Sequence, residues 1–489
     1  MLEKLRTRPH AVAGSRCAPR TVLFQVLVLV GCITAATAEP TNILFIAIDD
    51  LNDWTGTYGG HPQAETPNMD RLAAQGLQFS NAHCQAPICG PSRNSLLTGI
   101  LPSTSGLYFL KPLSIRDTAT LKAAVTLPQY FLTHGYRTLA AGKVFHQNDE
   151  ASFPEYGGGF GRLGPYPKKR ISFQRGSKNV DWGRVPFLDD EMPDSKIADW
   201  AIEQLEKPHD RPFFLGCGFF RPHWPWYVGD KWFEPFPLED IQIPETLAGT
   251  GANVSDYARK LTYSAAAPRH RWMVESDEWQ HAVQAYLASV RFVDHCVGRV
   301  LEALKNSDHA DNTLIVLWSD HGYHLGEKQR WAKRSLWEES TRVPLILAGP
   351  GIPGGAVCER PVGLIDLYPT LVDYARLPRK PHLDGVSLMP LIQNPSAPWK
   401  RPTITTFGPH NHAIRSERWR YIHYADGSEE LYDHRTDPNE RFNLASELRF
   451  RDVIRKHRNW LPQVNAPLAE GSADSGSPLY DPKVIYQPN

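Results

Sequence analysis

The amino-acid sequence predicts an α/β fold, in which a large, mostly parallel mixed sheet is flanked by helices and followed by a smaller antiparallel α+β domain. Apolar runs typical of buried strands alternate with amphipathic helical segments between residues 42 and 377. Polar residues follow directly after several of these runs, at the strand ends where such sheets bind ligands. Near residue 393 the alternation gives way to short strands.

The expected elements of the first domain, residues 39–392, follow in chain order. The run NILFIAI at 42–48 is uniformly apolar, as in a strand buried on both faces. Thr66 as cap, Pro67 as first helical residue and Gly76 as stop define a helix. Further strands are expected within 136–145, 212–220, 312–322 and 343–350, and further helices within 126–135, 194–207, 278–306 and 364–377.

The second domain, residues 393–489, is expected to be smaller and antiparallel. The stretch AIRSERWRYIHYADGSEELYDHRTDP predicts two or three short strands with an Asp-Gly turn. The tail GSADSGSPLYDPKVIYQPN, from Gly471 onward, is rich in turn-forming residues and is expected to be poorly ordered.

The first 38 residues have the features of a signal peptide. Basic residues precede the apolar run TVLFQVLVLVGCITAATA, which is short for a membrane span, and an Ala-x-Ala cleavage site precedes Glu39. We therefore expect an exported protein, periplasmic or extracellular. The sequence LVGC, ending at Cys32, also resembles a bacterial lipoprotein box, so a lipid anchor through Cys32 is the alternative and would be the only membrane contact.

Composition excludes two broad classes of function. Among the 489 residues, 53 basic side chains balance 53 acidic ones, which argues against a nucleic-acid partner bound by bulk charge. The five cysteines that follow the leader are sparse and odd in number, so a disulfide scaffold is not expected.

Carboxylates mark two of the predicted strand ends. Asp49 and Asp50 follow the first strand, and Asp320 and His321 follow the run LIVLWS in the same way. Neighbouring carboxylates favour a bound cation, although a helix cap or a surface pair would explain either pair alone. Two such strand ends in one α/β chain favour a metal site.

Cys89 lies in the stretch CQAPICGPSRNSLLTG, where Pro91 suits the first turn of a helix that ends at Gly99. A helix N-terminus favours an anion such as sulfate and lowers the pKa of a thiol. Cys89 is therefore expected at an anion site or as a nucleophile. A buried thiol and a bridge to Cys84 are the structural alternatives.

Several motifs together resemble the type I, formylglycine-dependent sulfatases. CGPSRNSLLTG is similar to their Cys-x-Pro-Ser-Arg signature, and the other motifs occur in the family's order, closest to the iduronate-2-sulfatase-like branch: IDD, ETPNMDRLAAQG, GKVFH, RPHWPW and SDHG followed by GEKQRWAK. The resemblance implies the alkaline-phosphatase-like fold. It also implies that Cys89 is oxidised to Cα-formylglycine, whose hydrate attacks sulfur and then expels sulfate by C–O cleavage.

The resemblance also assigns roles to individual residues. A Ca²⁺ ion would polarise the sulfate; its expected ligands are Asp49, Asp50, the residue at position 89, Asp320 and His321. His321 departs from the Asn of most sulfatases, which we take as a mark of the subgroup. The expected catalytic residues are Cys89, Arg93, Lys143, His146, His223 and Lys333, since several cationic donors suit a sulfate ester.

The expected substrate is a sulfated polysaccharide or oligosaccharide, the narrower expectation being a 2-O-sulfated uronic acid. Trp224, His410 and His412 are the predicted substrate contacts. The implied protein partner is a formylglycine-generating or anaerobic sulfatase-maturating enzyme acting on Cys89. Two other functions are the alternatives: a phosphate or phosphonate monoester hydrolase of the same fold, and a secreted glycan-binding protein without turnover.

Overall fold

The computed structural model describes residues 41–175, 177–246 and 254–487. The strand predicted at the start of the chain, β1 (Asn42–Ile48), lies inside an eight-stranded sheet of order β13–β2–β12–β9–β1–β7–β4–β5. Its other members are β13 (Ala356–Cys358), β2 (Leu77–Phe79), β12 (Leu345–Ala348), β9 (Thr313–Ser319), β7 (Phe213–Phe219), β4 (Arg137–Gly142) and β5 (Glu155–Tyr156).

The sheet is mixed, as expected. The strands from β9 to β5 run parallel, and β12 is antiparallel to both of its neighbours. The carboxyl ends of β1, β9, β7 and β4 therefore meet at one edge. This is the edge at which the sequence predicts the site.

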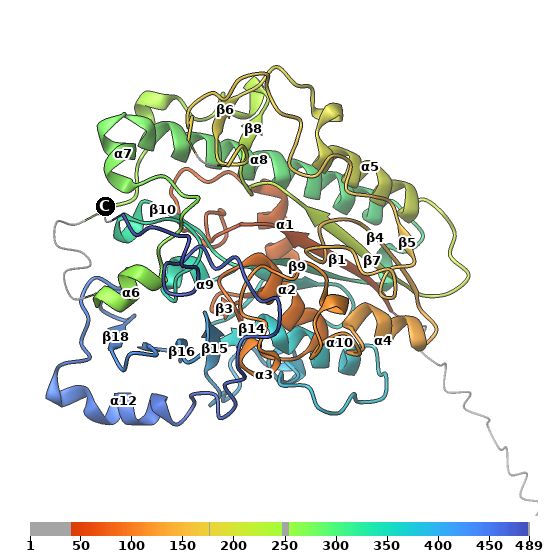
Figure 1. Ribbon diagram of the computed structural model, residues 1–489. Helices are drawn as coiled ribbons and strands as arrows, with labels where there is room; N and C mark the ends of the chain where they lie inside the picture. Colours follow the sequence, from red (N-terminus) through yellow and green to blue (C-terminus); the bar gives the residue numbers. More distant parts are fainter. Residues whose placement is uncertain (1–40, 176, 247–253, 488–489) are drawn as a thin grey trace, which may run out of the picture. The chain divides into compact units, whose positions relative to one another are not determined.

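Side chains of β1 alternate between two cores, because successive residues of a strand face opposite sides of a sheet. Leu44, Ile46 and Ile48 pack with α5 (Pro193–Leu205) and α8 (Glu278–Lys305). The residues between them face the second core. Figure 1 shows α5 and α8 on one side of the sheet and α4 (Leu127–Thr133) and α10 (Leu367–Tyr374) on the other.

The remaining elements are short or lie outside the main sheet. The helices are α1 (Pro67–Gln75), α2 (Cys89–Thr98), α3 (Pro102–Ser105), α6 (Asp256–Leu261), α7 (His270–Glu275), α9 (Glu338–Thr341) and α11 (Met389–Gln393). The paired strands are β3 (Ala82–His83) with β14 (Val362–Gly363), β6 (Trp182–Arg184) with β8 (Trp226–Val228), and β10 (His324–Leu325) with β11 (Trp331–Ala332).

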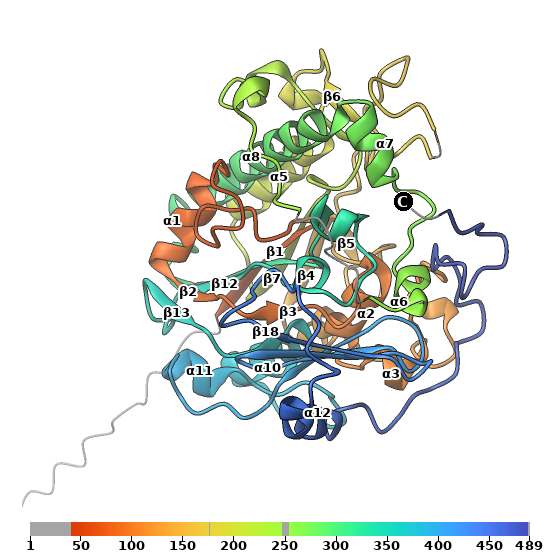
Figure 2. The same cartoon turned by 90° about the vertical axis from the view of Figure 1, so that its left-hand side faces the viewer.

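The C-terminal part forms a four-stranded antiparallel sheet, β15 (Thr403–Thr406), β16 (His412–Arg415), β17 (Trp419–His423) and β18 (Glu429–Asp433). The predicted Asp-Gly turn joins β17 to β18. The helix α12 (Arg451–Arg458) packs on this sheet through Ile454 (Figure 2). Residues from Pro40 onward form one compact unit, so the boundary at residue 393 stays a prediction about the chain.

The terminal segment is ordered by contacts with distant parts of the chain, contrary to the expectation from its composition. Lys111 and Ala473 form an antiparallel bridge, and Ser475 and Ser477 are buried. The predicted leader 1–38, with Cys32, lies outside the described residues. Within the described ranges, no helix is both long and apolar enough to span a membrane.

Candidate active site

Asp49 and Asp50 lie where β1 ends, and both are fully buried. The Asp49 amide still continues the ladder to the Phe219 carbonyl, but Asp50 has a left-handed φ of 63°. This break in the strand allows two neighbouring side chains to converge, which regular strand geometry would prevent.

Asp320 and His321 follow β9, which pairs with β1 so that Ser319 lies opposite Ile48. The two strand ends are therefore adjacent, and the Asp50 amide donates to Asp320 Oδ1 at 3.1 Å. The register of the sheet explains why two motifs 270 residues apart form one cluster.

Arg93 joins the carboxylates of the two strands. Its Nε donates to Asp320 Oδ2 at 2.8 Å and its Nη2 to Asp49 Oδ1 at 3.2 Å, and the guanidinium is fully buried. Arg93 lies four residues after Cys89, one helical turn on, a spacing that would let it reach back to the group at position 89. The described hydrogen bonds of its guanidinium instead hold the carboxylates and the carbonyls of Lys143 and Val144.

Cys89 is the first residue of α2, as the position of Pro91 predicted, and it is only 2% exposed. Its Sγ lies 3.3 Å from His321 Nε2 and 3.3 Å from Lys333 Nζ. Burial alone would raise the pKa of the thiol, but the charges of Lys143, Lys333 and His321 hold it well below its ordinary value. The surroundings of Cys89 therefore stabilise an anion. The five cysteines of the described chain are all free thiols, so no bridge to Cys84 forms.

Three other predicted residues come from the ends of β4 and β7. Lys143 forms an ion pair with Asp49. His146 influences the pKa of Cys89 through a side-chain hydrogen bond, and its Nδ1 is buried without a partner. His223 is 19% exposed, with Nε2 3.9 Å from Asp50 Oδ2. This partial exposure leaves His223 available to a ligand.

Lys333 comes from the segment that follows β11. Its Nζ lies 2.5 Å from Asp50 Oδ1 as well as beside Cys89. The residues on either side of it, Ala332 and Arg334, have left-handed φ values of 73° and 79°. Such strain is retained where the surrounding structure fixes the backbone, which is common around functional sites.

The cluster fits a bound cation. Ligand atoms of Asp49, Cys89, Asp320 and His321 lie within 4.8 Å of one another, as do those of Asp49, Asp50, Cys89 and His223. Asp50 Oδ2 is buried and has no hydrogen-bond partner. A buried, unpartnered carboxylate oxygen is costly unless a ligand completes it, and oxygen-rich sets suit Ca²⁺. The nitrogens of His321 and His223 and the sulfur of Cys89 are the exceptions within these sets.

Comparison with known proteins decides the family. The sulfatase family model matches residues 41–377, and the model of the C-terminal region of N-sulphoglucosamine sulphohydrolase matches residues 326–466. The chain belongs to the sulfatase family. It is therefore a sulfuric ester hydrolase, and its fold is the predicted alkaline-phosphatase-like one.

Individual relatives agree with this assignment. A sulfatase of Formosa agariphila is 42% identical over 443 residues, covering 88% of this chain and 87% of the relative. Iduronate 2-sulfatase of Mus musculus is 32% identical over 419 residues, covering 74% and 75%. The solved phosphonate monoester hydrolase of Silicibacter pomeroyi has a TM-score of 0.71 at 20% identity, covering 86% of this chain and 94% of its own, and so shares the fold.

The predicted substrate contacts of this sulfatase lie less favourably than its catalytic residues. Trp224 is 6% exposed and packs against Trp226 and Tyr323, so its ring belongs to the core and offers little stacking surface. Both ring nitrogens of His412 are bonded, to Thr406 and Asn465, so neither is free for a substrate. The exposed His410 has no contact with the Cys89 cluster within the described chain.

The sequence analysis did not single out Arg334 or Tyr323, which border the cluster. The charges of Asp50 and Cys89 act on both side chains. Arg334 follows Lys333 directly, and that adjacency is the one signal that would have indicated it. Tyr323 lies two residues after His321 in the polar stretch SDHGYHLGEK, and that proximity is the signal that would have indicated it.

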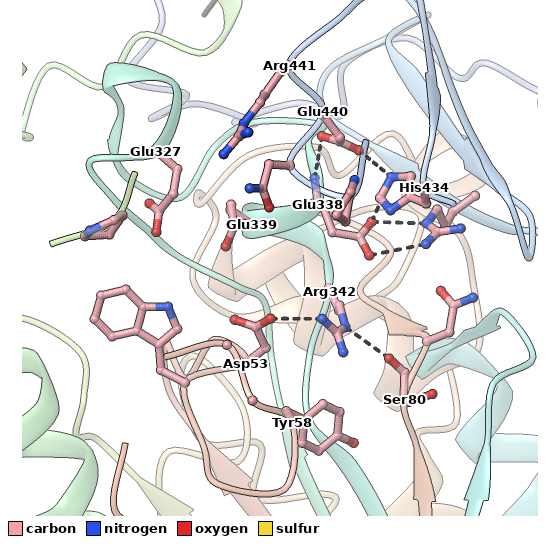
Figure 3. Close-up of a pocket in the computed structure, with 18 of the residues that line it drawn as sticks. Asp53, Tyr58, Ser80, Glu327, Glu338, Glu339, Arg342, His434, Glu440 and Arg441 are labelled. Carbon is pink, nitrogen blue, oxygen red and sulfur yellow. Dashed lines mark hydrogen bonds and ion pairs between the residues drawn. The ribbon is translucent and has the colours of Figure 1, made fainter. Parts of the chain in front are cut away.

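A cavity of about 570 Å³ lies apart from the predicted catalytic and metal-binding residues, none of which lines it. Figure 3 shows Asp53, Glu327 and Glu339 in this cavity, with His434 between Glu338 and Glu440. The predicted catalytic residues gather around Cys89 and not in this cavity.

Proposed function

We propose that this sulfatase hydrolyses sulfate esters of a sulfated polysaccharide or oligosaccharide, and that its substrate carries a 2-O-sulfated uronic acid. The likeness to iduronate 2-sulfatase of Mus musculus supports the narrower statement. The zero net charge of the chain is compatible with an acidic sugar, because the cationic side chains gather locally around Cys89.

One observation carries the proposal. Cys89 begins a buried helix, and its Sγ lies 3.3 Å from both Lys333 and His321, beside the unpartnered Asp50 Oδ2. When Cys89 is oxidised to Cα-formylglycine and Ca²⁺ is bound, they supply a hydrated aldehyde as nucleophile and a charge for the sulfate oxygens. Asp49, Asp50, Asp320 and His321 would hold the ion with residue 89.

The remaining residues orient charges and move protons. Arg93 and Lys143 hold Asp49 in place, so its carboxylate keeps one orientation. Lys333 is placed to bind an oxygen of the sulfate ester, since its ammonium faces the group at position 89. His223, the more exposed histidine, is suited to protonate the leaving oxygen, and His146 to accept a proton from the group at position 89.

The proposal extends to maturation and location. A formylglycine-generating or anaerobic sulfatase-maturating enzyme would oxidise Cys89. The leader 1–38 would direct export to the periplasm or the medium, with a lipid anchor at Cys32 as the alternative. Mass spectrometry of the mature N-terminus distinguishes cleavage before Glu39 from lipidation at Cys32.

The experiment that tests the function has two parts. The mass of the tryptic peptide that contains Cys89 measures its conversion to formylglycine. The converted protein is then assayed for sulfate release on defined sulfated disaccharides, with and without a Ca²⁺ chelator. Full activity with an unmodified thiol, or activity that is insensitive to removal of the metal, would contradict the proposed mechanism.

The similarity to the phosphonate monoester hydrolase of Silicibacter pomeroyi favours one second candidate. An enzyme of that kind would cleave a phosphonate or phosphate monoester at the same cluster. Rates on 4-nitrophenyl sulfate and on phenyl phosphonate esters separate the two functions. We expect the sulfate to be the faster substrate, and a faster phosphonate would reverse the assignment.

A further inference from the structure

Three segments surround the first turn of α2 beside the Cys89 cluster: residues 107–111, 333–334 and 473–476. We call these three segments the rim, and Arg334 belongs to the second of them. A Cβ placed on Gly90 would lie 3.3 Å from the Leu110 carbonyl. Lys111 pairs with Ala473, and the Arg334 amide donates to the Pro87 carbonyl at 3.0 Å. These contacts close the ring around the first turn of α2.

The third rim segment belongs to the C-terminal stretch beyond residue 466, outside both family models. It is bound along residues 103–111, where Ala466 donates to Ser103 and Ala469 to Gly106. It then continues past α6, where Ser477 Oγ donates to the Lys260 carbonyl at 2.7 Å. The position of this segment is therefore fixed by the fold at the edge of the catalytic centre.

The guanidinium of Arg334 lies against this segment. A Cβ on Gly476 would lie 2.0 Å from its Nη1, and Gly476 has a φ of 69°, a conformation that favours glycine. Asp474, Cys89 and Asp50 all act on its charge. The neighbouring Lys333 contacts Cys89 Sγ at 3.3 Å, so Arg334 lies beside the Cys89 cluster.

Arg334 and its neighbour Lys333 differ in their protein partners. Within the described part of the chain, its guanidinium makes no hydrogen bond and no ion pair, although the side chain is partly buried and Asp474 is nearby. Lys333, by contrast, is already engaged by Asp50 and Cys89. A partly buried guanidinium with free donors fits a bidentate oxyanion ligand.

We propose that Arg334 is a specificity-determining residue that binds a second oxyanion of the substrate, a carboxylate or a further sulfate, beside the sulfate ester that is cleaved. This inference rests on the proposed action on an acidic, sulfated sugar. This contact would make the enzyme selective for substrates with two anionic groups, since an ester without a second anion leaves Arg334 unpaired.

Three substrates test this inference in the mature enzyme: 4-nitrophenyl sulfate, a 2-O-sulfated uronate disaccharide that carries an additional sulfate, and the methyl ester of that same disaccharide. The variants are Arg334→Met and Arg334→Lys. The control is Arg376→Met, because Arg376 also has a left-handed φ, 55°, and no side-chain partner in the described chain, but is exposed after α10.

Arg334→Met is expected to lower kcat/KM on the uronate disaccharide about 30-fold, mainly through KM, and to change it less than about 2-fold on 4-nitrophenyl sulfate. Arg334→Lys should lose about 5-fold, because it keeps the charge without the planar fork. A loss that persists on the methyl ester identifies the second sulfate as the partner. A loss that disappears there identifies the carboxylate.

Equal losses on all three substrates, or no loss on the uronate disaccharide, would overturn the proposal. Calorimetry on the unmodified Cys89 protein measures binding without turnover, and its ligand is the same disaccharide without the 2-O-sulfate but with its carboxylate and additional sulfate. Weaker binding to Arg334→Met than to Arg376→Met supports the proposal, and equal binding overturns it. Absence of sulfate release by fully converted wild-type enzyme would instead count against the proposed function.

Discussion

Two buried groups of acidic residues and histidine in this protein look alike but differ in how their carboxylates are paired. Around Cys89, Asp50 Oδ2 and His146 Nδ1 are buried without partners. In the second group, which lines the cavity of Figure 3, Glu338 and Glu440 also meet a histidine, His434, and could by distance hold a metal.

The carboxylates of the second group are paired from within. Arg415 and Arg420 both pair with Glu338, and Arg420 Nε lies 2.5 Å from Glu440 Oε1. The other Glu440 oxygen accepts the Glu338 amide at 3.0 Å. The difference teaches that acidic side chains near a histidine do not by themselves mark a site. Unpartnered buried atoms beside a nucleophile do.

The largest expected effect is on catalysis. Cys89→Ala should lower the rate of sulfate release at least about 1,000-fold, because it removes the nucleophile. The assay is turnover of 4-nitrophenyl sulfate, with thermal melting to show that the variant folds. Activity within about 10-fold of wild type would place the chemistry elsewhere.

Substitution in the second group should reduce stability and leave catalysis nearly unchanged. Glu338→Gln should destabilise the fold by roughly 3–5 kcal/mol, because Arg415 and Arg420 would remain buried with incomplete compensation. Urea unfolding measures this loss, and the turnover per folded molecule should stay within about 2-fold of wild type. A selective loss of turnover without loss of stability would show that this group also serves catalysis.

Ca²⁺ should bind at the Cys89 cluster and not at the second group, and should thereby stabilise the folded protein. At a concentration about 100 times its Kd, the ion should add about 2.7 kcal/mol to the free energy of unfolding of the wild type. Asp50→Asn should abolish most of this gain, because it weakens the donor set that contains the unpartnered oxygen. Glu338→Gln is the matched control and should retain the gain; a gain lost in that variant would place the ion at the second group.

The smallest expected effect is on the pH dependence of stability. Burial would raise the pKa of Glu338, but Arg415, His434 and Arg420 hold it well below its ordinary value of 4.5. The unfolded chain therefore takes up this proton first, so the stabilisation is present above pH 4.5 and is lost as the pH falls below it. As the pH is lowered from about 7 to about 3.5, the urea concentration at the midpoint of unfolding should fall more steeply for the wild type than for Glu338→Gln. Parallel curves would contradict the low pKa.

Much of the catalytic cluster could be predicted because its signals are local. Pro91 placed the start of α2 at Cys89, and the apolar run before Asp49 placed β1. The rule that ligands bind at strand ends then joined Asp49 with Asp320. The contacts of Arg93 with the carboxylates could not be predicted from helical spacing, because they depend on how α2 packs against the strand ends.

Long-range contacts explain what the sequence did not reveal. The antiparallel direction of β12 depends on how its connection crosses the sheet, and a four-residue strand carries no sign of direction. The order of the terminal segment depends on partners such as Tyr108, whose hydroxyl donates to the Ala466 carbonyl 358 residues away. Its turn-rich composition describes the local chain and contains no information about these partners.

The burial of α2 has a consequence for how active protein can be obtained. Every residue of this helix is buried, and Cys89 is 2% exposed, so a second protein has no access to the thiol after the chain has folded. The proposed oxidation must therefore precede folding, and the converted fraction is fixed during synthesis. Preparations from different expression hosts can then share the same melting curve and differ in specific activity, so that active-site titration, not a folding criterion, measures their quality.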